Sequence, residues 1–406
     1  MEQVAITGMG LVSSLGHELD AVADALRHGA SGIVRDNERV KLGFRTPLTG
    51  SIRDFDPAVV LSRNERRSMS EPALYGAVAS LRALADANLS REKMRSPQAG
   101  VIIGNDSSAD AARWTADETR REGTTRLLGS AAVINGMNSS PSMTLSVLLG
   151  TKGVCWTMSS ACASGANAIG LGSMLIAMGQ QDVVLVGGVQ EINWTAMAGF
   201  DALGAFSTWD GDPTAASRPF SADRAGLVPS GGGAMLILES MRHARARSAR
   251  IRARVHAYTY SSDGEHITTP DGDGAKRCMR SALAMAEMCP TDIDYVSAHA
   301  TGTPAGDAVE ALAIADVFGD ACPPVSSTKG MTGHECWMSG ASEVIYSLLM
   351  AEHGFIAANK NLDRPDDAFR NLNLVMETIP MAPRMILSNS FGFGGTNACL
   401  IVEAFR

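Results

Sequence analysis

Cys162 is the residue in this sequence that is best placed to act as a nucleophile. Apolar residues over 153–157 predict a short buried strand, and residues 163–180 predict a helix rich in Ala, Gly, Leu, Ile and Met. A thiol on such a strand-to-helix turn lies at the positive end of the helix, which stabilises a thiolate. Because free cysteines are also often small buried apolar groups, this stretch alone leaves both interpretations open.

A second candidate motif is His-Ala-Thr-Gly-Thr-Pro-Ala-Gly-Asp at 299–307. His299 directly follows a predicted strand over 294–298, and turns after strands are where sites collect in α/β folds. Asp307 and Glu310 fall three residues apart in the first turn of the helix predicted next. Taken alone, such a histidine is often a hydrogen-bonded structural group.

Two glycine-rich segments complete the set of motifs. Residues 326–334 hold Lys329 and His334 in a loop after a predicted strand, and residues 389–397 form a turn between two strands. Each has an ordinary interpretation, as a surface lysine or a simple hairpin. Together with Cys162, however, two imidazoles and a glycine turn suit acyl transfer, because they can hold a thioester carbonyl whose oxygen becomes an enolate.

Composition excludes several other classes of protein. A formal net charge of −8 over 406 residues argues against general nucleic-acid or membrane-surface binding, and no apolar run is long enough to span a bilayer. The arginine-rich run 241–254 is interpreted as a helix end with exposed side chains. Seven scattered cysteines without a CxxC pair, and a start without a secretion signal, predict no disulfide framework, no zinc site and a cytoplasmic location.

The elements that must position these residues alternate between strands and helices in both halves of the chain. This rhythm predicts an α/β fold with parallel-rich sheets and two packed halves, 1–250 with the cysteine and 251–406 with the two histidines. The first strand is expected over 4–7, followed by a turn at 8–10.

The motifs resemble those of the elongating β-ketoacyl-acyl-carrier-protein synthases of the thiolase superfamily. SSACASG, HATGTPAGD, STKGMTGH and NSFGFGGTN occur in this order and cover nearly the whole chain, and residues 200–208 are closer to synthase I than to synthase II. The resemblance implies a thiolase-like fold of duplicated αβ halves in five layers, α-β-α-β-α.

The resemblance also implies roles for individual residues. Cys162 would be the acylated nucleophile, and His299 and His334 would hold the malonyl thioester carbonyl. Lys329 would be the active-site lysine, with the acidic residues Asp307, Glu310 and Glu343 around it. The hydroxyls of Thr301 and Thr303 would bind the pantetheine arm. The amides of Cys162 and Phe393 would form the oxyanion hole, with Phe391 as the gate.

The implied reaction is transfer of an acyl group to Cys162, decarboxylation of malonyl carrier protein and Claisen condensation to a 3-oxoacyl product in fatty acid biosynthesis. It needs no metal and no cofactor besides the phosphopantetheine of the acyl carrier protein. Arg63, Arg66 and Arg67 match the region that docks this acidic partner. A homodimer is expected, with a heterodimer as the alternative.

Two departures from the family pattern concern the acyl pocket. Glu335-Cys336-Trp337-Met338 follows His334 where small residues are usual, and Ser107 stands where a bulky gate residue is found. These departures either reshape the acyl pocket or are offset by changes in the packing of neighbouring side chains. The alternative function is a ketosynthase of a specialised polyketide or aryl-polyene pathway. A thiolase lacks support because the last glycine turn has no cysteine, and a non-catalytic partner subunit would lack Cys162.

Overall fold

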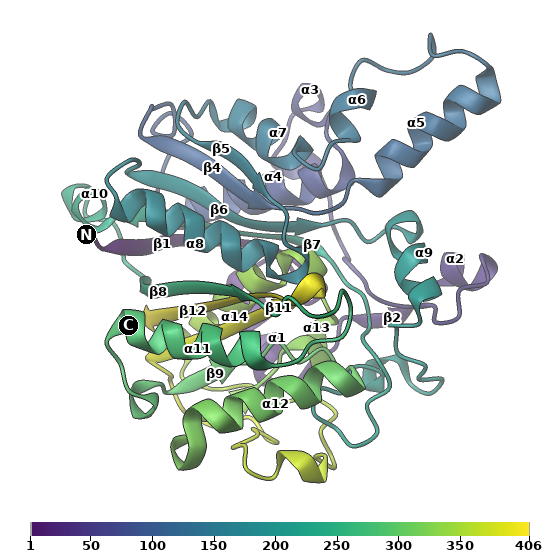
Figure 1. Cartoon of the computed structure of the whole chain (residues 1–406). Coiled ribbons are helices and arrows are strands. Elements are labelled where there is room, and N and C mark those ends of the chain that lie inside the picture. The colour runs from purple at the N-terminus through teal and green to yellow at the C-terminus, as the bar shows by residue number, and fades with distance from the viewer. Residues whose placement is uncertain (1, 406) are drawn as a thin grey trace.

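The computed structural model, which describes residues 2–405, contains a ten-stranded β-sheet that we divide between β1 and β8 into two five-stranded sheets, with helices on both faces of each (Figure 1). The first sheet contains β5, β4, β6, β7 and β1 in spatial order, and the second contains β8, β12, β11, β9 and β10. Backbone hydrogen bonds join the two sheets where β1 meets β8, but only three residue pairs are shared there. The strands are β1 Val4–Val12, β4 Ala99–Gly104, β5 Cys155–Met158, β6 Val183–Gln190, β7 Gly232–Ser240, β8 Ala253–Ser262, β9 Tyr295–Ser297, β10 Val325–Ser326, β11 Met385–Gly392 and β12 Thr396–Ala404.

The two sheets have the same topology. When the five strands of each sheet are numbered along the chain, both sheets have the spatial order 3-2-4-5-1. In both sheets, strands 3, 2 and 4 pair parallel to one another. Strand 5 pairs antiparallel with both of its neighbours, strands 4 and 1. This repetition confirms the predicted duplicated αβ halves.

Helices form three layers around the two sheets. The middle layer is α8 (Ser164–Ala177) and α14 (Ser339–His353), which pack on each other and on strands of both sheets. One outer layer is α4 (Glu71–Asp86) and α7 (Ser140–Leu149), and the other is α11 (Asp273–Ala286) and α12 (Pro304–Phe318). The predicted five-layered α-β-α-β-α arrangement is therefore present (Figure 1). Nearly every residue of α14 is buried because it is covered on both sides.

The remaining elements are shorter or lie outside the layers. A small hairpin, β2 Ile33–Arg35 with β3 Leu48–Gly50, forms a separate sheet. The other helices are α1 Leu19–Arg27, α2 Asn37–Lys41, α3 Arg63–Arg66, α5 Ala109–Glu122, α6 Ala132–Asn135, α9 Trp194–Leu203, α10 Met241–Ala246 and α13 Lys329–Thr332. Helices α5 and α6 form an arm that projects from the body (Figure 1). Among residues 2–405, none of the helices has both the length and the apolar character needed to cross a bilayer.

The expected turn at residues 8–10 is wrong. β1 continues to Val12, and Gly8 and Gly10 lie inside it, under helix α4. A Cβ at Gly10 would lie 2.0 Å from the carbonyl oxygen of Ala79. The glycines are therefore there to let the helix backbone approach the strand, and they do not mark a change of direction.

Three other expectations need correction. The sheets are mixed, because the last strand of each half returns antiparallel to its neighbours. The strand near residues 153–157 is the edge strand β5, and Trp156 on it is 50% exposed. In the run 241–254, Arg242, Arg245 and Arg250 are exposed as expected, but Arg252 is 8% exposed. Its guanidinium binds the carboxylates of Asp86 and Glu352. A linear pattern of arginines does not reveal acidic partners from other parts of the chain.

Candidate active site

The turn that presents Cys162 is a single 3₁₀ turn over Ala161–Ala163, directly before α8. Ala161 has φ +49°, a left-handed conformation that is unusual for a residue with a side chain. The Ala161 N–H donates to Oδ2 of Asp106 at 2.9 Å, and the Ser160 N–H donates to Oγ of Ser164 at 2.9 Å. These bonds hold the strained turn and confirm the predicted placement of Cys162 between strand and helix.

The glycine turn after β11 comes directly against this cysteine. A Cβ at Gly392 would lie 2.9 Å from the backbone nitrogen of Cys162. Only a glycine therefore leaves space beside that N–H for a substrate atom. Phe393 follows Gly392, so the amides of Cys162 and Phe393 come from two segments that approach each other, as the sequence motifs predict.

Both histidines of the second half lie at the thiol. His334 Nε2 is 3.1 Å from Cys162 Sγ, and the rings of His299 and His334 meet edge to face with centroids 5.2 Å apart. Within residues 2–405, one ligand atom from each of these three residues lies within 4.8 Å of the others. Segments more than a hundred residues apart thus meet at one sulfur atom.

The thiol is protonated in the resting site. Burial raises the pKa of Cys162 to about 12, although the positive charge of Lys329 opposes this shift. Burial and the Lys329 charge also hold the pKa of His334 well below its ordinary value, so the imidazole is neutral. Desolvation therefore opposes the stabilisation that the helix end gives to a thiolate. A neutral imidazole 3.1 Å away can instead take the proton when the sulfur attacks.

Glu310 fixes the backbone that carries His299. Its carboxylate accepts hydrogen bonds from the N–H groups of His299 at 2.8 Å and Ala300 at 2.7 Å, and from Nδ2 of Asn389 at 3.1 Å. Asp307 does the same for the following loop by accepting from the Gly302 N–H at 3.0 Å. Burial raises the pKa of Glu310 to about 7. These carboxylates hold the backbone of the His299 loop, and Glu310 also lines the cavity that contains Cys162.

Lys329 and Glu343 form a fully buried ion pair behind the histidines, between α13 and α14. Burial raises the pKa of Glu343 to about 7, while the adjacent ammonium opposes the shift. Ser339, at the start of α14, places its hydroxyl 3.2 Å from Nδ1 of His334. This contact orients the ring so that Nε2 faces Cys162.

A cavity of about 320 Å³ reaches Cys162 from the surface. Its lining includes both histidines, the hydroxyl-bearing Thr301 and Thr303, and the rings of Phe391 and Phe393. The two threonine hydroxyl oxygens are 3.0 Å apart. The structure therefore collects the nucleophile, the imidazoles and the predicted arm-binding residues along a single channel.

Comparison with known proteins identifies the family that builds such a site. The family model described as Beta-ketoacyl synthase, N-terminal domain matches residues 1–244, and the C-terminal domain model matches residues 252–363. The chain belongs to the β-ketoacyl synthase family. It is 40% identical, over 100% of both chains, to the 3-oxoacyl-[acyl-carrier-protein] synthase 1 of Haemophilus influenzae. The chain is therefore an acyltransferase of the condensing type.

Solved structures agree with this assignment. A β-ketoacyl synthase from Burkholderia phymatum superposes with a TM-score of 0.95 at 34% identity, with 100% of both chains covered. The ishigamide ketosynthase/chain length factor superposes with a TM-score of 0.92 at 31% identity, again over 100% of both chains. The second structure contains a ketosynthase described together with a partner chain.

The departure after His334 places an indole in the apolar cluster of Cys162, although Trp337 is not among the residues that line the cavity. Trp337 is 7% exposed and packs in one apolar cluster with Cys162 and Cys336. Its ring centroid lies 6.1 Å from that of Phe200, a residue that lines the cavity. The Nε1–H of Trp337 is buried without a hydrogen-bond partner among residues 2–405. The indole is therefore held by packing alone.

Other predicted residues lie away from the cavity lining. The Ser107 hydroxyl donates to Glu191 at 2.7 Å, and Met338 is fully buried in the main core. Arg63 and Arg67 are exposed on and beside α3, and Arg66 is half-buried with its Nε donating to the Leu61 carbonyl. None of these residues contacts the thiol cavity as the structure describes it over residues 2–405.

Several residues that shape the site were missed from the sequence. Asn389 lies inside a predicted motif, but only the fold shows that its amide supports Glu310. Phe200 and Ser339 gave no chemical signal. The loop 263–272 also lines the cavity, and its composition resembles any polar surface loop.

Proposed function

We propose that this chain catalyses the decarboxylative condensation of an acyl group on Cys162 with a malonyl group on acyl carrier protein. The observation that supports this most strongly is the contact of 3.1 Å between His334 Nε2 and Cys162 Sγ at the inner end of an open channel. The product is a 3-oxoacyl carrier protein, which is the substrate class of fatty acid elongation.

In the first half-reaction, the sulfur of Cys162 attacks the acyl thioester while His334 Nε2 takes the thiol proton. A carbon–sulfur bond forms to Cys162, and the bond to the carrier thiol breaks. The departing carrier sulfur takes the proton back from His334, so protons balance. The N–H groups of Cys162 and Phe393 stabilise the oxyanion that forms between the two bond changes.

In the second half-reaction, the malonyl carboxylate leaves as carbon dioxide and its bonding electrons pass into an enolate. His299 and His334 are neutral because burial lowers the pKa of both, and a neutral imidazole can donate one N–H to the enolate oxygen. The enolate carbon then attacks the acyl carbonyl carbon and forms the new carbon–carbon bond. The bond to the Cys162 sulfur breaks, and the departing thiolate takes up a proton from solvent.

This chemistry calls for no metal or redox cofactor. No step transfers an electron to or from the substrates, and the negative charge that develops in each step is carried by an oxygen or a sulfur atom. The substrates arrive on the phosphopantetheine arm of the carrier protein. Thr301 and Thr303 support this proposal, since their hydroxyls lie in the channel where the amides of such an arm would pass.

Replacing His299 with alanine tests the division of work between the two imidazoles. We expect malonyl decarboxylation to fall by about 10²- to 10³-fold, because one enolate donor is lost. Acyl transfer to Cys162 should fall by less than about 10-fold, since His334 still contacts the thiol. His334→Ala should slow both half-reactions. Separate assays of acyl transfer by intact mass and of carbon dioxide release would measure this, and an equal loss of both in His299→Ala would contradict it.

Trp337 is proposed to restrict the acyl pocket because it packs against Cys162 and Phe200. In Trp337→Leu, the ratio of kcat/KM for a long acyl carrier protein to that for a short one should rise about 10-fold, as the smaller side chain leaves space. Phe369, buried in a different apolar cluster from Trp337, gives a Phe369→Leu control that should keep the parent ratio. An unchanged profile in Trp337→Leu would assign this residue to packing and leave open a specialised polyketide role for the chain.

Carrier-protein docking on Arg63, Arg66 and Arg67 is part of the proposal. Arg63 and Arg67 are exposed, and over residues 2–405 neither makes an ion pair within the chain, so both are available to an acidic partner. Reversing both charges to glutamate should raise KM for the carrier protein at low salt and leave kcat unchanged, with the difference shrinking at high salt. A salt-independent KM in the parent would rule out this docking mode.

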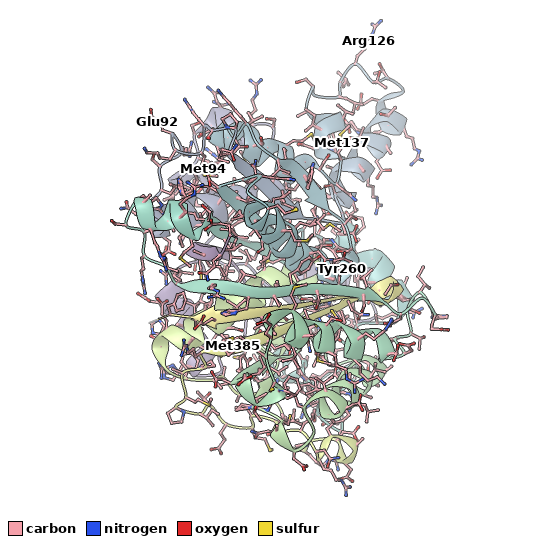
Figure 2. The ribbon with its side chains drawn as sticks, turned by 60° about the vertical axis from the view of Figure 1, so that its left-hand side comes forward. Glu92, Met94, Arg126, Met137, Tyr260 and Met385 are labelled. Carbon is pink, nitrogen blue, oxygen red and sulfur yellow. The ribbon has the colours of Figure 1, made fainter. Side chains whose placement is uncertain are left out.

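We also propose that the chain forms a homodimer through the edge of the first sheet. Strand β5 lies at that edge and exposes Trp156, and the projecting arm exposes further apolar side chains. Figure 2 shows Arg126 at the tip of the arm and Met137 nearer the body; Met137 is 43% exposed. Light scattering should give twice the chain mass of 42.6 kDa. A monomeric mass that doubles only with a ketosynthase-like partner would indicate a heterodimer.

The predicted cytoplasmic location and the division into halves 1–250 and 251–406 remain part of this proposal. All seven cysteines are free thiols, which suits a reducing compartment. The repeated strand order of the two sheets supports a division between β7 and β8.

A further inference from the structure

The three reactive side chains also form a donor set for a metal ion. Cys162 offers a sulfur, and His299 and His334 each offer a ring nitrogen, with all three atoms within 4.8 Å of one another. Catalytic zinc sites use three protein ligands of these types and leave a fourth position for a small ligand. The cavity that reaches the thiol gives water access to that fourth position.

The contacts of the two imidazoles leave ring nitrogens available to a metal. Ser339 Oγ lies 3.2 Å from His334 Nδ1, a contact that orients Nε2 in the way that hydrogen-bond partners orient zinc-bound histidines. His299 is 8% exposed and its Nδ1 has no hydrogen-bond partner within residues 2–405. Lys329 forms a buried ion pair with Glu343, which offsets part of its positive charge.

We propose that Cys162, His299 and His334 bind a divalent cation of the zinc class and that this binding reversibly inactivates the enzyme. The thiol proton passes to solvent as a sulfur–metal bond forms, and two nitrogen–metal bonds form without loss of a proton. The bound sulfur can no longer attack an acyl thioester. Conversely, an acylated Cys162 has no thiolate to offer, so acylation and metal binding exclude each other. Oxygen-preferring cations such as Mg²⁺ do not compete for this set.

Cobalt(II) is a suitable probe, because thiolate coordination gives it a charge-transfer absorption band in the near ultraviolet. Titrating the full chain with cobalt(II) should produce this band with one ion per chain, and zinc(II) should remove it. The band should be absent in Cys162→Ser and in parent protein whose Cys162 has been alkylated with iodoacetamide. In His299→Ala the affinity for cobalt(II) should fall by more than ~100-fold. The loss of a residue that only hydrogen-bonds to a metal ligand lowers metal affinity by ~10–100-fold, and the loss of a ligand itself should cost more.

The matched control is Cys289→Ser, which removes an exposed thiol and should keep the band unchanged. A titration without a thiolate band, or a band that survives both loss and alkylation of Cys162, would overturn the metal site. Acyl transfer is measured on the same preparation. A protein that takes the acyl group but gives no band refutes only the metal site, whereas a protein that gives the band but never takes an acyl group refutes only the condensing function.

Discussion

Cys162→Ala should lower the rate of condensation by at least ~10⁴-fold, because no other sulfur among residues 2–405 lies in contact with both imidazoles at the end of the channel. Decarboxylation of malonyl carrier protein should persist in this variant, since His299 and His334 remain to hold the enolate oxygen. Condensation is measured as 3-oxoacyl product, and decarboxylation as carbon dioxide released without product.

The nearby thiol of Cys336 provides the matched control for this experiment. It belongs to the same apolar cluster as Cys162 and lines the same cavity, yet no hydrogen bond joins it to an imidazole over residues 2–405. Burial raises its pKa well above the ordinary value for a cysteine. Cys336→Ala should therefore keep condensation within about 10-fold of the parent rate. Condensation that survives in Cys162→Ala and is lost in Cys336→Ala would move the nucleophile to position 336.

Lys329→Met should lower the free energy of unfolding by about 3–5 kcal/mol, because it leaves the buried Glu343 without its cation, and this group must then stay charged in an apolar site or take up a proton. Urea unfolding of the parent and variant would measure the difference. Condensation should fall as well, since the Lys329 charge acts on Cys162 and on both imidazoles.

A double variant separates the ion pair from the side-chain packing. Lys329→Met with Glu343→Gln removes both charges and should recover most of the lost stability without recovering condensation. If the free energy of unfolding of Lys329→Met alone lies within about 1 kcal/mol of the parent value, the buried ion pair contributes little to stability. Lys329 then acts only through its charge at the site.

The sequence was sufficient to predict the chemistry because the reactive residues lie in short motifs at strand ends. The turn at Cys162, the position of His299 after a strand and the glycine turn before β12 all follow from local patterns. The duplicated halves followed from the alternation of elements and from the resemblance. The distance from Cys162 to His334, by contrast, depends on the packing of α8 against α14 between the sheets.

The remaining features depend on contacts that no local pattern encodes. The glycines of β1 resemble a turn until helix α4 is placed over them. The pKa of Cys162 depends on burial by segments from both halves, and a helix end alone does not indicate that burial. Arg252 resembles a surface arginine until Asp86 and Glu352 are brought beside it.

The central claim is that Cys162 carries the acyl group in front of two imidazoles, and peptide mapping of the acylated enzyme tests it most directly. The parent protein is incubated with acyl carrier protein alone, quenched in acid, digested and analysed by mass spectrometry. We predict one acyl group per chain, on the peptide that contains Cys162, released by neutral hydroxylamine as a thioester. An acyl group on any other residue, or none while condensation proceeds, would contradict the account.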